Sequence, residues 1–426
     1  MLMRTLYHFP EVYKNQFLNP ENLRRIQEKR LRYIVNFAYR NTRIYKEKFR
    51  NAHITPSDIQ TLDDLTKIPL ITKEEIKEVF PDGIVTRGFT EDICKTETTS
   101  GSSGNMLKIL HDPPAWSRCN AVIYRDMLGA GVRPWHKYSV MSHIDVTFAE
   151  ASQKSVFKRV LIIPETMSEE EHVELLRIHR PHVVGGHPSL FVMMAKVIEK
   201  KGIEDVNPEL ILVGGELAYP EYRRYIEKIF KCETFDKYGA YETYSISWEC
   251  RHHKNHLDAD SVLVEFLREG EPVAPGERGE VVVTNLQNRA MPFIRYQLGD
   301  VGVPSDELCE CGRTLPLIKE VEGKSDDFIV LPSGDLIPSR RVIPPFFAEP
   351  RIGQFKVIQD RKTHVLVKIS PLDGFTEEIE HKLLKDVERI LGESMSVEIE
   401  KVDNIEQTGR GKFKRVHRIY APSLNL

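Results

Sequence analysis

Residues 120–235 constrain the fold most, because short apolar runs alternate there with amphipathic stretches. Three apolar runs predict buried strands: YSVMSHI (138–144), HVVGGH (182–187) and LILVGGE (210–216). Two amphipathic stretches predict helices: SEEEHVELLRIH (168–179) and YPEYRRYIEKIF (219–230). Strands and helices in alternation form a mainly parallel sheet that helices cover on both faces. Such sheets bind ligands at the carboxyl ends of their strands, which points to the loop that begins at Gly214.

The N-terminal region is predicted to be helical. Residues 20–52 place apolar side chains at helical spacing and basic side chains on the other face, which predicts one amphipathic helix. Thr72 and Glu75 form a capping-box pattern, in which two side chains satisfy exposed backbone amides reciprocally. A second, short helix is therefore expected to begin at this point.

The pattern changes again after the alternating region. Residues 262–303 are β-rich and contain the turn EGEPVAPGERG. After Gly323 a smaller α+β unit is expected, with these strands and this helix: FIVLPSGDLIP (328–338), QFKVIQD (354–360), THVLVKIS (363–370) and EEIEHKLLKDVERILG (377–392). A chain of 426 residues is too long for one compact core. We therefore expect two domains, 1–323 and 324–426.

Composition excludes several classes of protein. Apolar residues make up 41% and charged residues 29%, with a net charge of −3, so no basic field is available to recruit nucleic acid or anionic lipid. The first residues, MLMRTLYHFPEVYKN, lack the apolar core of a signal peptide, and the run HVVGGHPSLFVMMAKVIEK is too interrupted to span a membrane. With only six cysteines, a disulfide framework is not expected. These features predict a cytoplasmic protein without nucleic-acid or membrane partners.

A loop rich in hydroxyl side chains and glycine, TETTSGSSGNMLKI (96–109), is typical of phosphate binding. Glycine lets backbone N–H groups approach an anion closely, and hydroxyls donate further hydrogen bonds. The P-loop pattern G-x-x-x-x-G-K-[ST] is absent here. Taken alone, the loop fits a flexible surface turn somewhat better than it fits a phosphate site.

Several motifs in order along the chain resemble the adenylate-forming enzyme superfamily, and more narrowly its phenylacetate–coenzyme A ligase and coenzyme F390 synthetase branch. The N-terminal stretches RYIVNFAYRNTRIYKEKF and TLDDLTKIPLITKEEI resemble the opening of that branch. The remaining motifs are TSGSSG (99–104), GGE (214–216), YGAYET (238–243), YQLGD (296–300), GKSDD (323–327) and GRGKFKRV (409–416). The resemblance implies a large N-terminal α/β domain with mixed and parallel sheets flanked by helices, and a small mobile α+β C-terminal domain.

The resemblance also implies a nucleotide site for ATP and Mg²⁺. The phosphate-binding residues would be Thr99, Ser100, Gly101, Ser102, Ser103 and Gly104. Adenine and ribose would contact Gly214, Gly215, Glu216, Tyr238, Gly239 and Asp300. Glu242 would hold Mg²⁺, a hard cation that prefers oxygen ligands. The sequence departs from the family's pattern at two positions, and each departure weakens one expected contact with the nucleotide. Lys324 stands where the family has arginine. The phosphate loop lacks the family's Lys-Pro pair, and Lys108 is the nearest lysine that could replace it.

A lysine near the end of the chain is implied as a catalytic group. Lys412 follows Gly411 in the family's position, and Lys414 is its rival because the basic cluster leaves the register open. The ammonium would bridge the substrate carboxylate and the α-phosphate, where negative charge accumulates. Asp326 occupies the family's hinge position, about which the small domain would close and then swing.

Cysteine and histidine residues predict a metal site. Cys309-x-Cys311 offers two soft ligands, and EC250RHHKNH256 offers one more thiol and a histidine. A Cys₃His set forms a closed tetrahedral site for structural zinc, and the resembled branch has a similar cluster in these positions. The expected ligands are Cys250, His256, Cys309 and Cys311, with His252 or His253 as competitors for the histidine position.

The acid-binding pocket and the acceptor are the least determined by the sequence. The candidate pocket residues are Tyr138, His143, His187, Pro188, Ser189 and Ala240. The resemblance implies an acid–CoA ligase that converts an aromatic or other small carboxylic acid to its acyl-adenylate and then to a CoA thioester. Adenylation without CoA stays open, with a carrier-protein thiol or a deazaflavin hydroxyl as acceptor, and so does an inactive nucleotide-binding protein. The oligomeric state also stays open, a homodimer included.

Overall fold

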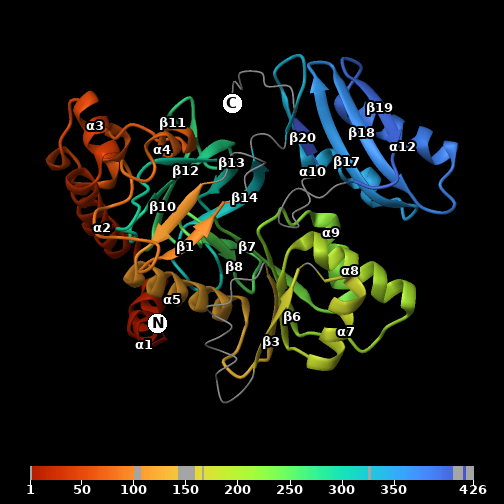
Figure 1. Ribbon diagram of the computed structural model, residues 1–426, viewed down its shortest axis with the longest axis horizontal. Helices are drawn as coiled ribbons and strands as arrows, with labels where there is room; N and C mark the ends of the chain where they lie inside the picture. Colours follow the sequence, from red (N-terminus) through yellow and green to blue (C-terminus); the bar gives the residue numbers. More distant parts are fainter. Residues whose placement is uncertain are drawn as a thin grey trace.

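The computed structural model describes residues 2–99, 107–142, 159–165, 167–324, 328–405 and 416–418. In this part of the chain, a twelve-stranded mixed sheet flanked by helices forms the large body (Figure 1). A separate four-stranded sheet near the C-terminus forms the smaller unit. The predicted α/β class is confirmed.

The large sheet has the strand order β11-β10-β12-β13-β14-β9-β8-β7-β6-β5-β3-β4. Its parallel half comprises β3 (Tyr138–Ser142), β4 (Val160–Pro164), β5 (Val183–Gly186), β6 (Leu210–Gly214) and β7 (Glu233–Tyr238). Its antiparallel half comprises β8 (Ser247–Glu249), β9 (Asn255–Leu257), β10 (Val262–Arg268), β11 (Glu271–Pro272), β12 (Gly279–Asn285), β13 (Tyr296–Ser305) and β14 (Leu317–Lys324). The predicted strands of both halves are therefore present, in one continuous sheet.

Helices cover both faces of the parallel half, as predicted. Side chains of one face, such as Met141 and Val213, pack with α7 (Glu169–His179), α8 (Pro188–Lys201) and α9 (Pro220–Phe230). Side chains of the opposite face pack with α5 (Pro113–Ala130) and the residues after it. Because successive strand residues alternate between faces, each strand contributes to both cores.

The predicted helix over residues 20–52 is wrong in one respect, because it is two helices. α2 (Pro20–Asn41) ends before Thr42, and α3 (Arg43–Asn51) follows. Thr42 has an extended backbone (φ −127°, ψ 145°), and its hydroxyl donates to the carbonyl of Ala38 at 2.8 Å. A threonine that bonds the preceding turn offers the backbone an alternative to the helical ladder, which explains the break.

Other N-terminal elements surround these helices. They are α1 (Leu2–Asn15), two 3₁₀ turns (Pro56–Asp58 and Leu62–Lys67), α4 (Lys73–Val79), β1 (Lys95–Thr98) and β2 (Lys108–His111). The capping box predicted for α4 is confirmed: the Glu75 amide donates to Thr72 Oγ1 at 3.2 Å, and the Thr72 amide donates to Glu75 Oε2 at 2.8 Å. None of the helices in the described ranges has the length and apolar character needed to cross a membrane.

The C-terminal unit contains the predicted helix and the strands predicted over residues 354–360 and 363–370, but residues 328–338, predicted as one strand, form two short antiparallel strands joined by a turn. Its elements are β15 (Phe328–Val330), β16 (Leu336–Pro338), α10 (Ser339–Val342), α11 (Pro344–Phe347), β17 (Ile352–Arg361), β18 (His364–Pro371), α12 (Glu377–Leu391), β19 (Ser396–Lys401) and β20 (Val416–Arg418). Four strands form the sheet β19-β18-β17-β20. The ring of Phe347 packs against Tyr222 of α9, with ring centroids 4.4 Å apart, so this unit lies against the large body beside α9 (Figure 1).

Candidate active site and metal centre

The hydroxyl-rich loop connects the antiparallel strands β1 and β2. At its base, the Thr99 amide donates to the carbonyl of Leu107 at 2.9 Å, and the Leu107 amide donates to Thr99 Oγ1 at 2.8 Å. Thr99 is therefore buried and closes the hairpin. Lys108 Nζ lies 2.8 Å from Glu91 Oε1, so this lysine forms an ion pair with a carboxylate of the segment that precedes β1.

The carboxyl end of β6 forms a backbone wall. Gly214 pairs with Lys237 of β7, and a Cβ on Gly214 would lie 2.7 Å from the Lys237 carbonyl oxygen, so only glycine fits. Gly215 follows with φ of 77°, a conformation that favours glycine. Glu216 Oε2 accepts a hydrogen bond from the Ser189 amide at 3.3 Å, which connects this turn to the start of α8.

Two residues predicted to hold the nucleoside lie in direct contact. The hydroxyl of Tyr238 donates to Asp300 Oδ2 at 2.7 Å, although the two residues are far apart in the sequence. Burial and the neighbouring Asp300 carboxylate raise the pKa of Tyr238, so the hydroxyl stays protonated. The backbone of Lys324 pairs with Asp300 across β13 and β14, which brings a third predicted residue to the same place.

The predicted magnesium ligand, Glu242, is buried and follows Tyr238 closely in the sequence. Its carbonyl accepts a hydrogen bond from Asn285 Nδ2 at 2.8 Å, and its carboxylate bonds the side chain of Tyr296. Burial, together with the Glu242 carboxylate, raises the pKa of Tyr296, so this hydroxyl is a donor. The turn before Glu242 is tight, because a Cβ on Gly239 would lie 2.0 Å from the Tyr244 carbonyl oxygen.

The candidate pocket residues do not all lie at one end of the parallel strands, because His187 and Ala240 follow the carboxyl ends of β5 and β7 whereas Tyr138 begins β3. His187 Nδ1 lies 2.8 Å from the Gly214 carbonyl, and its Nε2 lies 3.2 Å from Glu165 Oε1, so both ring nitrogens have partners. Tyr138 projects over Gly185, because a Cβ on that glycine would lie 2.2 Å from the tyrosine hydroxyl. Ala240 packs on the core beneath the antiparallel half.

Several predicted site residues lie outside the described part of the chain. They are Ser100, Gly101, Ser102, Ser103, Gly104, His143, Asp326, Lys412 and Lys414. Their predicted roles stay predictions.

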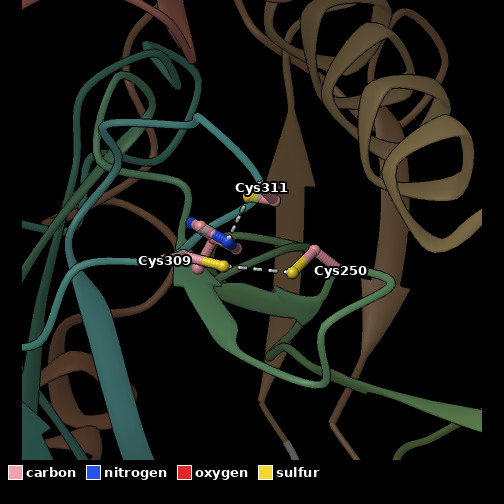
Figure 2. A group of neighbouring side chains, drawn as sticks. Cys250, Cys309 and Cys311 are labelled. Atoms are coloured by element: carbon pink, nitrogen blue, oxygen red, sulfur yellow. Dashed lines mark hydrogen bonds between the residues drawn. The ribbon is translucent and has the colours of Figure 1, made fainter.

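The four predicted metal ligands converge. Cys250, His256, Cys309 and Cys311 each offer a ligand atom, and these atoms all lie within 4.8 Å of one another (Figure 2). Cys250 Sγ is 3.5 Å from Cys309 Sγ, and Cys311 Sγ is 3.3 Å from His256 Nε2. Burial lowers the pKa of His256 to about 4, which keeps the imidazole neutral, as a metal ligand must be. His253 instead stacks on Phe235, with ring centroids 4.9 Å apart, and contacts Glu249.

Three side chains beside the predicted nucleotide and acid-pocket residues were not predicted as site residues. Tyr296, Glu165 and Lys237 each stand next to a predicted motif or at the end of a predicted strand. Tyr296 begins YQLGD, Glu165 follows β4, and Lys237 precedes YGAYET. Position at the carboxyl end of a parallel strand is the signal that could have drawn attention to Glu165 and Lys237.

Comparisons with known proteins agree with this arrangement. Residues 330–418 match the family model of the CapK C-terminal domain. A phenylacetate-coenzyme A ligase of Thermus thermophilus is 26% identical over 388 residues, covering 86% of this chain and 85% of that protein. One from Aromatoleum evansii is 25% identical over 428 residues, covering 93% and 94%.

A crystal structure of 2-hydroxyisobutyryl-CoA ligase, in the postadenylation state with R3-HIB-AMP, has a TM-score of 0.81. It is 18% identical and is matched over 95% of this chain and 91% of that one. At this identity the likeness establishes the fold, including the small C-terminal unit. The chain is therefore similar in sequence to phenylacetate-coenzyme A ligases over most of its length, and it has the fold of an adenylate-forming CoA ligase.

Proposed function

We propose that this protein activates a carboxylic acid with ATP, releasing pyrophosphate, and transfers the acyl group from the adenylate to coenzyme A. The observation that carries the proposal is the contact between Tyr238 and Asp300 beside the Gly214 turn. The half-buried ring of Tyr238, the buried carboxylate of Asp300, which would bond the ribose, and the glycine turn after β6 lie at the end of a parallel sheet, where such folds bind ligands. The relatives named phenylacetate-coenzyme A ligase support the same activity.

The proposed roles follow from the charges that the reaction must handle. A carboxylate oxygen attacks the α-phosphorus and pyrophosphate leaves, so two anions must be brought together. Thr99 would shape the base of the loop whose hydroxyls and amides hold the terminal phosphates. Glu242 would hold Mg²⁺, which neutralises phosphate charge when bound. Lys412 would supply a cation to the α-phosphate and the acid.

The two domains have separate parts in the proposed reaction. We propose a boundary near residue 323, with 324–426 as a mobile unit that closes over the large body about Asp326. The separate four-stranded sheet and the family match over residues 330–418 support this division. After adenylation the same unit would turn to present another face for attack by the CoA thiol.

We also propose that Cys250, His256, Cys309 and Cys311 hold one structural zinc ion. Three thiols and one imidazole provide four ligands of the kinds that zinc prefers, and a closed set leaves no position for substrate. The ligands come from the β8–β9 hairpin and from the loop before β14. Zinc would therefore join segments that meet at the centre of the large sheet.

A screen of acids tests the proposed activity. Wild-type protein is expected to release pyrophosphate with at least one aryl, heteroaryl or aliphatic acid, and to form AMP and a thioester when CoA is added. Release that does not depend on CoA, with no thioester by mass spectrometry, would favour adenylation alone. The absence of pyrophosphate release with every acid, combined with retained ATP binding, would favour a non-catalytic nucleotide-binding protein.

The Glu242→Gln variant is expected to lower kcat/KM for pyrophosphate release roughly 100-fold. Glutamine keeps the shape and can still accept the hydrogen bond of Tyr296, but it removes the charge that would hold Mg²⁺. Rates measured against magnesium concentration should show a raised magnesium requirement. The control is Glu209→Gln at a carboxylate that is 58% exposed. An unchanged magnesium dependence in Glu242→Gln would contradict the assigned role.

A further inference from the structure

The N-terminal helix α1 and the turn after it present a row of large apolar side chains to solvent. Their exposed fractions run from 42% for Tyr13 to 80% for Met3 and Tyr7. The exposed residues are Leu2, Met3, Leu6, Tyr7, Tyr13 and Phe17. Single exposed apolar residues are normal at a protein surface, whereas a contiguous patch of them marks an interaction site.

Helical spacing places these side chains on one side of α1. With the turn of an α-helix, they and the exposed ring of Pro10 fall within about 140° of the helix circumference. Phe17 continues the row, because its amide donates to the Lys14 carbonyl at 3.1 Å and its ring centroid lies 5.8 Å from that of Tyr13. The buried residues of α1 lie on the other side: Thr5, Val12 and Asn15. We call the six exposed residues and Pro10 the α1 stripe.

The contacts of α1 with the large body fix the stripe in place. Glu11 Oε2 lies 2.9 Å from Arg118 Nη1 of α5, and Asn15 Nδ2 donates to Asp260 Oδ2 at 2.9 Å. Figure 1 shows α1 beside α5 at the lower edge of the large body, away from the C-terminal unit. A surface that is already ordered loses little conformational freedom when a partner binds.

The size of the stripe is close to what a stable dimer needs. A fully exposed large side chain presents about 200 Å², so the six exposed residues together present roughly 700 Å². The largest apolar patch of a monomeric protein is commonly no more than about 600 Å². A standard interface buries about 800 Å² on each partner. The stripe is therefore large enough to form most of one side of such an interface.

The order of the residues along the stripe indicates that the partner is a second copy of this chain. Five residues are separated by 4, 3, 3 and 4 positions, so their spacing is the same from either end: Met3, Tyr7, Pro10, Tyr13 and Phe17. A twofold interface uses the same patch on both subunits, so it requires a surface that complements itself. With the axis at Pro10, two antiparallel α1 helices place Met3 against Phe17 of the second copy. Tyr7 then meets Tyr13 as an aromatic pair.

A membrane surface fits the stripe less well. Helices that lie on membranes are rich in lysine and arginine on their polar face, where they attract anionic lipid. α1 contains two such residues, Arg4 and Lys14, and between them the carboxylate of Glu11, which would repel such lipid.

We propose that the α1 stripe is the interface of a homodimer, in which the α1 helices of two copies pair antiparallel about Pro10. Burial of apolar surface would supply most of the free energy of association. This inference is independent of the proposed function, because α1 contains none of the predicted site residues.

Light scattering of the full chain after size exclusion, over a series of protein concentrations, tests the proposal. Wild-type protein is expected to have about twice the mass of one chain, which is 49.2 kDa. The Tyr7→Glu variant should raise the dissociation constant of the dimer roughly 100-fold or more, because each copy would bury a carboxylate without a partner. Since Tyr7 is 80% exposed in the single chain, the circular dichroism spectrum of the variant should equal that of wild type.

Two further measurements separate the stripe from other surfaces. Ile178→Glu makes a similar change at a side chain of α7 that is 70% exposed, and this variant should remain a dimer. Pro10→Cys should form a disulfide-linked dimer with oxidised glutathione, whereas Ile178→Cys should not. Loss of the dimer in Tyr7→Glu without this cross-link would overturn the antiparallel arrangement about Pro10.

Three results would overturn the interface itself. The first is wild-type protein that stays monomeric at every concentration, and the second is a dimer that Tyr7→Glu does not weaken. The third is a monomer that sediments with phosphatidylglycerol vesicles and loses this binding in Tyr7→Glu, which would assign the stripe to a lipid surface.

Discussion

Replacement of Lys412 by alanine is expected to lower acyl-adenylate formation roughly 1,000-fold while ATP binding changes little. The reaction joins a carboxylate to a phosphate, and the repulsion between them is greatest in the transition state. An ammonium placed at this point stabilises the transition state more than bound ATP, so its loss should appear in kcat rather than in nucleotide affinity. Pyrophosphate release with the best acid of the screen measures the first quantity, and calorimetry with Mg-ATP measures the second.

The nearby Lys414 provides the matched control for this experiment. It differs from Lys412 by two positions in the same basic segment, so Lys414→Ala alters local charge equally. Lys414→Ala is expected to retain adenylation within a few-fold of wild type. If Lys414→Ala loses adenylation and Lys412→Ala retains it, Lys414 is the catalytic lysine. If neither variant loses adenylation, the proposed mechanism is wrong at its C-terminal lysine.

Removal of one metal ligand is expected to produce the second large effect, on stability. Cys311→Ser removes a thiolate that lies 3.3 Å from His256 Nε2 and leaves three ligands for the ion. If free zinc in the wild-type preparation exceeds its Kd a thousandfold, bound metal stabilises the native state by about 4 kcal/mol. The variant should lose most of that free energy of unfolding. Thermal denaturation, together with elemental analysis showing about one zinc per wild-type chain, measures both effects.

Cys94→Ser is the matched control, because Cys94 is also half-buried but lies outside the cluster. It should keep the zinc content and the melting temperature of wild type. Chelation of wild type should reproduce the melting temperature of Cys311→Ser, and added zinc should reverse the effect of chelation only. Wild-type protein that is free of zinc and equally stable would contradict the proposed site.

Helix caps and strand patterns were predicted correctly, because the interactions that produce them join residues that are close together in the sequence. The Thr72 cap depends on two side chains and the amides between them, and it forms as expected. The alternation over residues 120–235 likewise predicts the parallel strands. The helix break at Thr42 was not predicted, because apolar residues keep their helical spacing across it. The hydrogen bond from the Thr42 hydroxyl to the Ala38 carbonyl leaves no trace in that spacing.

Contacts across the sheet were harder to predict because they depend on register. Spacing alone left three histidines as candidate ligands, and the β8–β9 pairing, with His256 opposite Trp248, decided which one meets the cysteines. The continuous sheet itself depends on distant pairing, such as that between His256 and Leu317. No local pattern of apolar residues specifies such a partner.

The sequence by itself determined the class of the fold, the order of its motifs and the three cysteines of the metal cluster. Only the tertiary structure decided that Tyr238 bonds Asp300, that Glu242 meets Tyr296 and that His256 is the histidine beside the cysteines. The physical reason is the range of the interactions. Helix caps and hydrophobic periodicity act between near neighbours in the chain, whereas a binding site needs side chains that packing brings together from distant strands.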